Sequence, residues 1–96
     1  MPAAVEEAAY LVVLEAVNNV VRHAGAANAE VVLRAGPGWL LLVVQDDGVG
    51  LDQPYVSGIG ITSMRGRVEA LGGDFTLQAA SASGGTQLQA RIPVQP

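Results

Sequence analysis

The hydrophobic pattern of the first quarter of the chain predicts a helix over residues 3–24. One side of its helical projection is apolar and carries Tyr10, Leu14, Val17, Val21 and Ala24. The other side is polar and carries Glu15, Asn18, Asn19 and Arg22. Gly25 follows and ends the predicted helix, because glycine readily adopts the backbone conformation that closes a helix.

Four stretches rich in β-branched and aliphatic residues predict strands, at residues 30–35, 39–46, 75–80 and 86–92. Turn-forming residues at 36–38 and 81–85 join them into two hairpins. The second strand is almost continuously apolar, so we expect both of its faces to be covered.

The segment between the hairpins predicts a loop over residues 48–60 and a second helix over residues 61–71. Met64, Val68 and Leu71 form its buried face, and Gly72-Gly73 ends it. The order helix, hairpin, loop, helix, hairpin predicts an α+β fold. We expect a two-layer α/β sandwich, with a mostly antiparallel sheet and helices packed on one face.

Composition narrows the function classes. The chain has 96 residues, of which 50% are hydrophobic and 15% are charged. This length and composition predict a single globular domain over residues 1–96. The net charge of −4 and the absence of a basic cluster argue against a nucleic-acid partner. The longest apolar run, residues 39–44, is too short to cross a membrane, and the N-terminus does not resemble a signal peptide. We therefore expect a cytoplasmic domain without direct membrane contact.

The missing residue types are also informative. Cysteine is absent and histidine occurs once, which excludes thiolate chemistry and a multi-histidine metal site. Lysine is absent as well, so a Walker-type phosphate loop is excluded. Any nucleotide phosphates must be held by other groups.

Polar residues within the first predicted helix are candidates for metal and phosphate binding. Glu15, Asn19 and His23 follow one another at helical spacing, with Arg22 beside them. An ordinary solvated helix face is the alternative. Asparagine is a poor residue for a helix interior, and amide and carboxylate oxygens suit Mg²⁺. The pattern therefore favours a site.

Asp46 ends the predicted apolar strand and is followed by Gly48 and Gly50. A buried carboxylate needs hydrogen-bond donors, and the exocyclic amine of adenine is one. The alternative is a turn aspartate that accepts hydrogen bonds from nearby backbone N–H groups. Glycines also precede the second helix, at Gly58 and Gly60, where free N–H groups could bind phosphate.

In combination, these residues resemble the Bergerat-fold (GHKL) ATPase superfamily. Glu15 and Asn19 match its N box, and Asp46, Gly48 and Gly50 match its G1 box. Residues 58–60 resemble the G2 box, and residues 84–86 resemble the last glycine motif. Within the superfamily, residues 15–24 and 64–73 look most like the catalytic ATP-binding domain of sensor histidine kinases that signal to NarL-type response regulators.

The resemblance implies specific roles. Asn19 and Glu15 would hold Mg²⁺, with Glu15 as the catalytic base or as the residue that orients a metal-bound water. Asp46 would bind adenine, supported by Thr86. Residues 51–57 would form a lid over the ATP. The implied nucleotide-binding residues are Asn19, Arg22, His23, Asp46, Gly48, Gly50, Gly58, Gly60, Ile61 and Thr86.

The resemblance also implies what the chain works with. The domain would bind Mg-ATP and supply the γ-phosphoryl group to a histidine on a separate dimerisation and phosphoacceptor domain, through which a response regulator would be reached. Relatives usually carry that domain and a further strand upstream, so the chain resembles a fragment. His23 is not expected to be the acceptor. Two departures are Gly66, where the branch usually has a charged residue, and Leu14, where it commonly has glutamine.

Two other functions remain open. One is a non-catalytic nucleotide-binding or regulatory module with the same fold. The other is a serine kinase of the anti-sigma type, which shares the sequence boxes.

Overall fold

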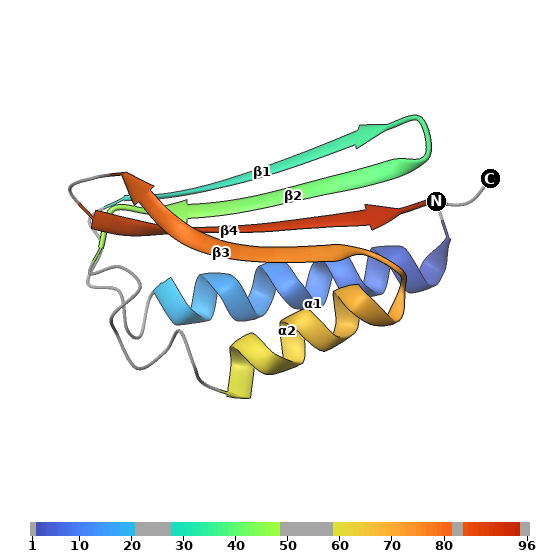
Figure 1. The fold of residues 1–96 in the computed structure, drawn as a ribbon, viewed down its shortest axis with the longest axis horizontal. Coiled ribbons are helices and arrows are strands. Elements are labelled where there is room, and N and C mark those ends of the chain that lie inside the picture. Colours follow the sequence, from blue (N-terminus) through green and yellow to red (C-terminus); the bar gives the residue numbers. More distant parts are fainter. Residues whose placement is uncertain (1, 21–27, 49–58, 82–83, 95–96) are drawn as a thin grey trace.

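The computed structural model describes residues 2–20, 28–48, 59–81 and 84–94. In chain order the elements are α1 (Ala3–Asn19), β1 (Ala29–Gly36), β2 (Trp39–Asp46), α2 (Ile59–Ala70), β3 (Asp74–Ser81) and β4 (Gly84–Pro93). The strands form one antiparallel sheet in the order β1-β2-β4-β3. Both helices lie on the same face of this sheet (Figure 1). The predicted α+β sandwich is confirmed.

Tight turns and neighbouring strands set the register of the sheet. In the first hairpin Gly36 pairs with Trp39, so Pro37 and Gly38 alone form the turn. Gly38 has a φ of 81°, a left-handed conformation that glycine adopts without steric cost. The second hairpin places β4 beside β2, where Asp46 lies opposite Thr86. The predicted strands are confirmed, and β1, β3 and β4 extend slightly beyond their predicted ends.

The buried face of α1 differs from the predicted one. The side of the projection that carries Tyr10, Leu14 and Val17 is exposed, with Tyr10 65% accessible. The helix instead buries mostly small residues against the sheet and α2: Val5, Ala8, Ala9, Val12, Ala16 and Asn19. Alanine allows a helix to approach a sheet closely, so these positions form the core although they are less hydrophobic than the exposed side. The predicted continuation of the helix over residues 21–24 and its end at Gly25 lie outside the described residues.

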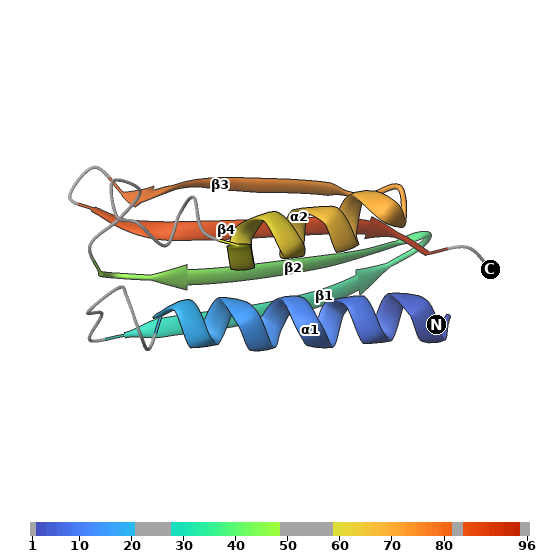
Figure 2. The same ribbon diagram turned by 90° about the horizontal axis from the view of Figure 1, so that it is seen from below.

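The prediction that both faces of β2 are covered is wrong for the described residues. Leu40, Leu42 and Val44 are almost fully buried beneath the helices. The intervening residues on the opposite face are half-buried, except for exposed Gln45. Both helices lie on the same side of the sheet in Figure 2, so no helix among the described residues covers the opposite face.

The second helix, α2, begins two residues before its predicted start and ends one residue before its predicted end. Met64 and Val68 are buried and Leu71 is half-buried. Gly72, with a φ of 80°, donates its N–H to Glu69, and Gly73 donates to the Val68 carbonyl. These bonds satisfy the last carbonyls of the helix. Of the predicted loop over residues 48–60, residues 49–58 lie outside the described part, and Ile59 and Gly60 belong to α2.

Among the residues that the structure describes, no helix is both long and apolar enough to cross a membrane.

Candidate functional site

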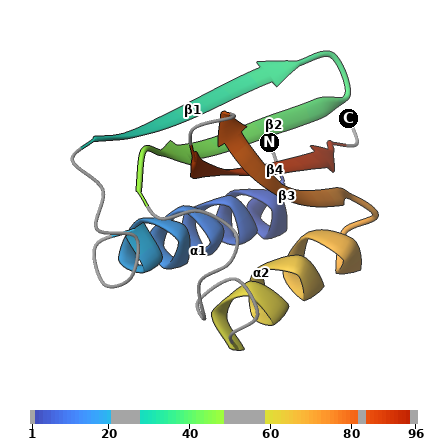
Figure 3. The ribbon, with the colours of Figure 1, turned by 60° about the vertical axis from the view of Figure 1, so that its left-hand side comes forward.

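Four chain segments meet at one end of the sandwich. They are the C-terminal end of α1, the end of β2, the beginning of α2 and the beginning of β4 (Figure 3). The antiparallel pairing of β2 with β4 brings the end of one strand to the start of the other. A pocket lies where the four segments meet, lined by Ala16, Asn19, Val20, Val44, Asp46, Ile61, Leu77, Thr86 and Leu88. Four of the predicted site residues therefore share one pocket.

Asp46 is the buried acid of this pocket. Its side chain is 6% exposed, and its Oδ1 accepts a hydrogen bond of 2.8 Å from the N–H of Gly48. This turn-type bond is the one that the alternative interpretation of Asp46 predicts. However, the residue also lines an apolar pocket, which a simple turn aspartate does not require. Asp46 thus stabilises the turn and presents a carboxylate to the pocket.

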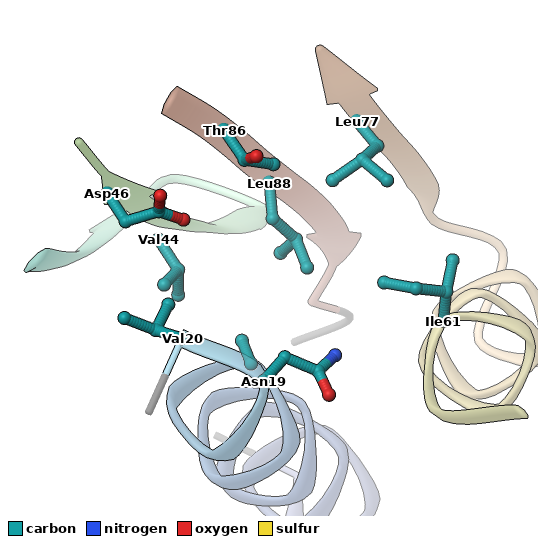
Figure 4. A pocket seen from close by; sticks show the side chains of 9 residues that line it. Asn19, Val20, Val44, Asp46, Ile61, Leu77, Thr86 and Leu88 are labelled. Atoms are coloured by element: carbon teal, nitrogen blue, oxygen red, sulfur yellow. The ribbon is translucent and has the colours of Figure 1, made fainter. Parts of the chain in front are cut away.

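Thr86 lies directly opposite Asp46 on β4 and is 3% exposed. Facing residues of adjacent strands point to the same side of a sheet, which places the hydroxyl-bearing side chain next to the carboxylate (Figure 4). The neighbouring Gly85 donates its backbone N–H to the Gly48 carbonyl over 3.1 Å. The two predicted glycine motifs are therefore joined by a main-chain hydrogen bond.

Asn19 approaches the pocket from α1. It is the last residue of the helix and is 6% exposed, whereas the adjacent Asn18 is exposed. The structure thus separates two neighbouring asparagines that the sequence placed on one polar side. Glu15 lies one helical turn earlier and is half-buried. An amide at the pocket and a carboxylate one turn earlier therefore follow one another along the helix, although Glu15 itself does not line the pocket.

The pocket walls are apolar. Figure 4 shows Val44, Val20 and Leu88 near the polar side chains of Asp46, Thr86 and Asn19. Leu77 of β3 and Ile61 of α2 line the opposite side of the pocket. The prediction had identified only Ile61 of this apolar set. Val44 and Leu88 could have been found, because they stand two residues from Asp46 and Thr86 and so share their face of the sheet. Leu77 could not, since only the pairing of β3 with β4 brings it there.

Asn28 and Asp47 form a second contact that the sequence did not predict. The backbone N–H and the side-chain amide of Asn28 each donate a 3.0 Å hydrogen bond to the carboxylate of Asp47. The N–H of Asp47 in turn donates to the carbonyl of Asn28 over 3.2 Å. This exposed clamp fixes the beginning of β1 beside the end of β2, next to Asp46.

The remaining predicted site residues are not all described. Arg22, His23, Gly50 and Gly58 lie outside the described residues. Gly60 belongs to the first turn of α2, which contains no acidic residue. Backbone N–H groups in this turn can bind an anion, because the first turn of a helix has N–H groups without helical partners.

Metal binding by the described residues would rely on few protein ligands. They contain no cluster of three or more acidic, histidine or cysteine side chains that could enclose an ion. Asn19 and Glu15 remain as a pair of oxygen donors, which matches Mg²⁺ when substrate phosphates and water complete its shell. The arrangement combines apolar walls, a buried carboxylate at Asp46 and the first turn of α2 at the same pocket.

Comparison with known proteins agrees with this geometry. Residues 4–96 match the family model described as "Histidine kinase-, DNA gyrase B-, and HSP90-like ATPase". The signal transduction histidine-protein kinase/phosphatase UhpB of Salmonella typhimurium is 41% identical over 85 residues, which are 82% of this chain and 15% of UhpB. The sensor histidine kinase LiaS of Bacillus subtilis is 36% identical over 95 residues, which are 96% of this chain and 26% of LiaS.

A solved structure that resembles this chain is also a histidine kinase domain. The histidine kinase domain of a blue-light activated histidine kinase from Erythrobacter litoralis matches with a TM-score of 0.72 and 28% identity. The match covers 97% of this chain and 46% of that structure. The chain therefore spans a minor part of the proteins it resembles. The resemblance predicted from the sequence boxes is confirmed.

Proposed function

The chain belongs to the histidine kinase-, DNA gyrase B- and HSP90-like ATPases, and on this basis we propose that it binds Mg-ATP for phosphorylation of a histidine. The acceptor histidine is on a separate helical domain of a two-component sensor kinase, and a response regulator receives the phosphoryl group from that domain. The observation that carries the proposal is the buried carboxylate of Asp46 in an apolar pocket, next to Thr86.

The pocket suits adenine. Its apolar walls favour a flat ring that leaves water, and Asp46 accepts a hydrogen bond from the exocyclic amine. The hydrogen bond from Gly48 fixes one oxygen of Asp46, so the carboxylate keeps its orientation when the base enters. The bond between Gly85 and Gly48 holds the two loops at a constant separation.

The helix side of the pocket suits phosphates and Mg²⁺. Asn19 and Glu15 would provide the protein oxygens for the metal, which when bound neutralises charge on the phosphates. The first turn of α2 directs N–H groups towards the same end of the molecule. Phosphoryl transfer depends mainly on positioning and charge neutralisation, so the residues of this chain bind and orient the nucleotide.

A titration of ATP with and without Mg²⁺ tests this proposal. We expect saturable ATP binding that Mg²⁺ strengthens, and loss of this Mg²⁺ effect in Asn19→Ala. Asn18→Ala is the matched control, because it removes the same side chain from an exposed position one residue away. Wild-type protein without measurable ATP binding, or equal Mg²⁺ dependence in both variants, would contradict the proposal.

A second measurement identifies which type of amino acid accepts the phosphoryl group. The chain is incubated with labelled ATP and the dimerisation domain encoded in the same reading frame. Acid-labile, base-stable label on that domain supports histidine phosphorylation. Acid-stable label on a protein serine would support an anti-sigma-type kinase instead, and ATP binding without any transfer would support a regulatory module.

A further inference from the structure

Arg65 of α2 contacts β3 in two ways at once. Its Nη1 donates a 3.1 Å hydrogen bond to the backbone carbonyl of Phe75, and its guanidinium carbon lies 4.9 Å from the centre of the Phe75 ring. Phe75 is buried in the core, whereas Arg65 is exposed. A planar guanidinium can stack on an aromatic ring while it donates hydrogen bonds. The Arg65–Phe75 contact therefore joins the surface of α2 to a fixed part of the core.

This contact is adjacent to the nucleotide pocket on both elements. Ile61 precedes Arg65 by four residues, so the two side chains lie on the same side of α2. Leu77 follows Phe75 by two residues and lies on the same face of β3. Ile61 and Leu77 line one side of the pocket, as Figure 4 shows. The same two elements thus form a wall of the pocket and, one turn of α2 away, the Arg65–Phe75 contact.

We propose that Arg65 is a positioning residue for the nucleotide, because it holds α2 against β3 and so keeps Ile61 next to Leu77. Arg65 is not among the residues that line the pocket. The inference rests on the proposed function, and it adds a residue that controls nucleotide affinity from outside the site.

The physical reason lies in the difference between apolar contacts and a hydrogen bond. Met64 and Val68 bury α2 on the core, but burial of apolar surface has no preferred direction. The bond from Arg65 to the Phe75 carbonyl is directional and fixes where the helix lies along the strand. If α2 occupies its binding-competent position for only a fraction of the time, the measured affinity falls by that fraction. Every ligand of the base pocket should then lose the same factor.

Titrations of ATP and of adenosine, followed by NMR chemical shifts, test this inference under conditions where each variant is folded. We expect Arg65→Ala to bind both ligands about five- to tenfold more weakly than the wild type. Arg65→Lys keeps a donor but loses the stacked guanidinium, so its affinities should lie between the two. Arg67→Ala is the matched control, since it removes the same side chain from an exposed position of the same helix. It should bind adenosine like the wild type.

The comparison of the two ligands separates positioning from charge. Removal of any arginine weakens the attraction for anionic ATP but not for neutral adenosine. If Arg65→Ala weakens ATP binding alone, or no more than Arg67→Ala does, net charge explains the effect and the inference is wrong. If Arg65→Ala is less stable to urea but binds both ligands like the wild type while folded, Arg65 only stabilises the fold, and the inference is again wrong.

The wild-type titration distinguishes the two levels of the argument. Wild-type protein that binds no ATP refutes the proposed function. Wild-type binding together with unchanged binding by Arg65→Ala refutes only the role of Arg65.

Discussion

Replacement of Asp46 by asparagine removes the negative charge while leaving the shape of the side chain nearly unchanged. In the folded protein the Asp46 Oδ1 accepts the Gly48 N–H over 2.8 Å, and an asparagine oxygen can accept the same bond. The amide nitrogen of the substituted side chain then takes the position of the second carboxylate oxygen. It can only donate, so it faces the amine of adenine as a second donor.

The size of the effect follows from this geometry. Loss of a hydrogen bond to a charged group costs about 1.5–3 kcal/mol, and the two opposed donors in a buried site add to this cost. We expect ATP affinity to fall by about 30-fold to 1,000-fold, equivalent to about 2–4 kcal/mol. The free energy of unfolding should change by only about 1 kcal/mol, because the bond to Gly48 is kept.

Isothermal titration calorimetry with ATP and with inosine triphosphate measures this prediction. Inosine carries a carbonyl oxygen where adenine has its amine, and this oxygen can accept a hydrogen bond from the new amide. Asp46→Asn should therefore lose much less affinity for inosine triphosphate than for ATP. Asp74→Asn is the control. It replaces an exposed aspartate at the beginning of β3 that does not line the pocket, and it should bind both nucleotides like the wild type.

The prediction can fail in a definite way. If Asp46→Asn is folded by circular dichroism and binds ATP as tightly as the wild type, Asp46 does not contact the base. If affinity for both nucleotides falls equally, the carboxylate stabilises the turn at Gly48 and does not accept a hydrogen bond from the base.

Three further changes test the structure. Gly66→Ala should stabilise the protein by about 1 kcal/mol in urea unfolding, since Gly66 is in the middle of α2 and an added Cβ meets no atom within 4 Å; unchanged stability would refute this. Gly73→Ala should instead destabilise the protein by about 2 kcal/mol or more, because its Cβ would overlap the backbone oxygen of Arg91; a neutral effect would show that the turn has room. Asp47→Ala should cost about 1 kcal/mol by removing both bonds from exposed Asn28, and Asp47→Asn should cost less; equal losses in the same unfolding assay would assign the effect to charge alone.

Local sequence was sufficient to predict most of the fold. The hairpin turn at Pro37-Gly38 and the helix end at Gly72-Gly73 depend on backbone preferences of single residues, so they could be read directly. The α1 face was predicted wrongly because a helical projection ranks positions by hydrophobicity. Packing instead selected small residues that fit against the sheet, which left Tyr10 and Leu14 exposed.

The sequence by itself determined the residue types of the site and their order, because Asn19, Asp46 and Thr86 belong to spaced motifs whose chemistry can be recognised without coordinates. Only the tertiary structure decided that these three residues share a pocket, that Leu77 helps to line it, and that Asn28 clamps Asp47 beside it. The physical reason is distance along the chain. Local preferences act over a few residues, whereas a pocket is formed by strand pairing and helix packing between segments far apart in sequence.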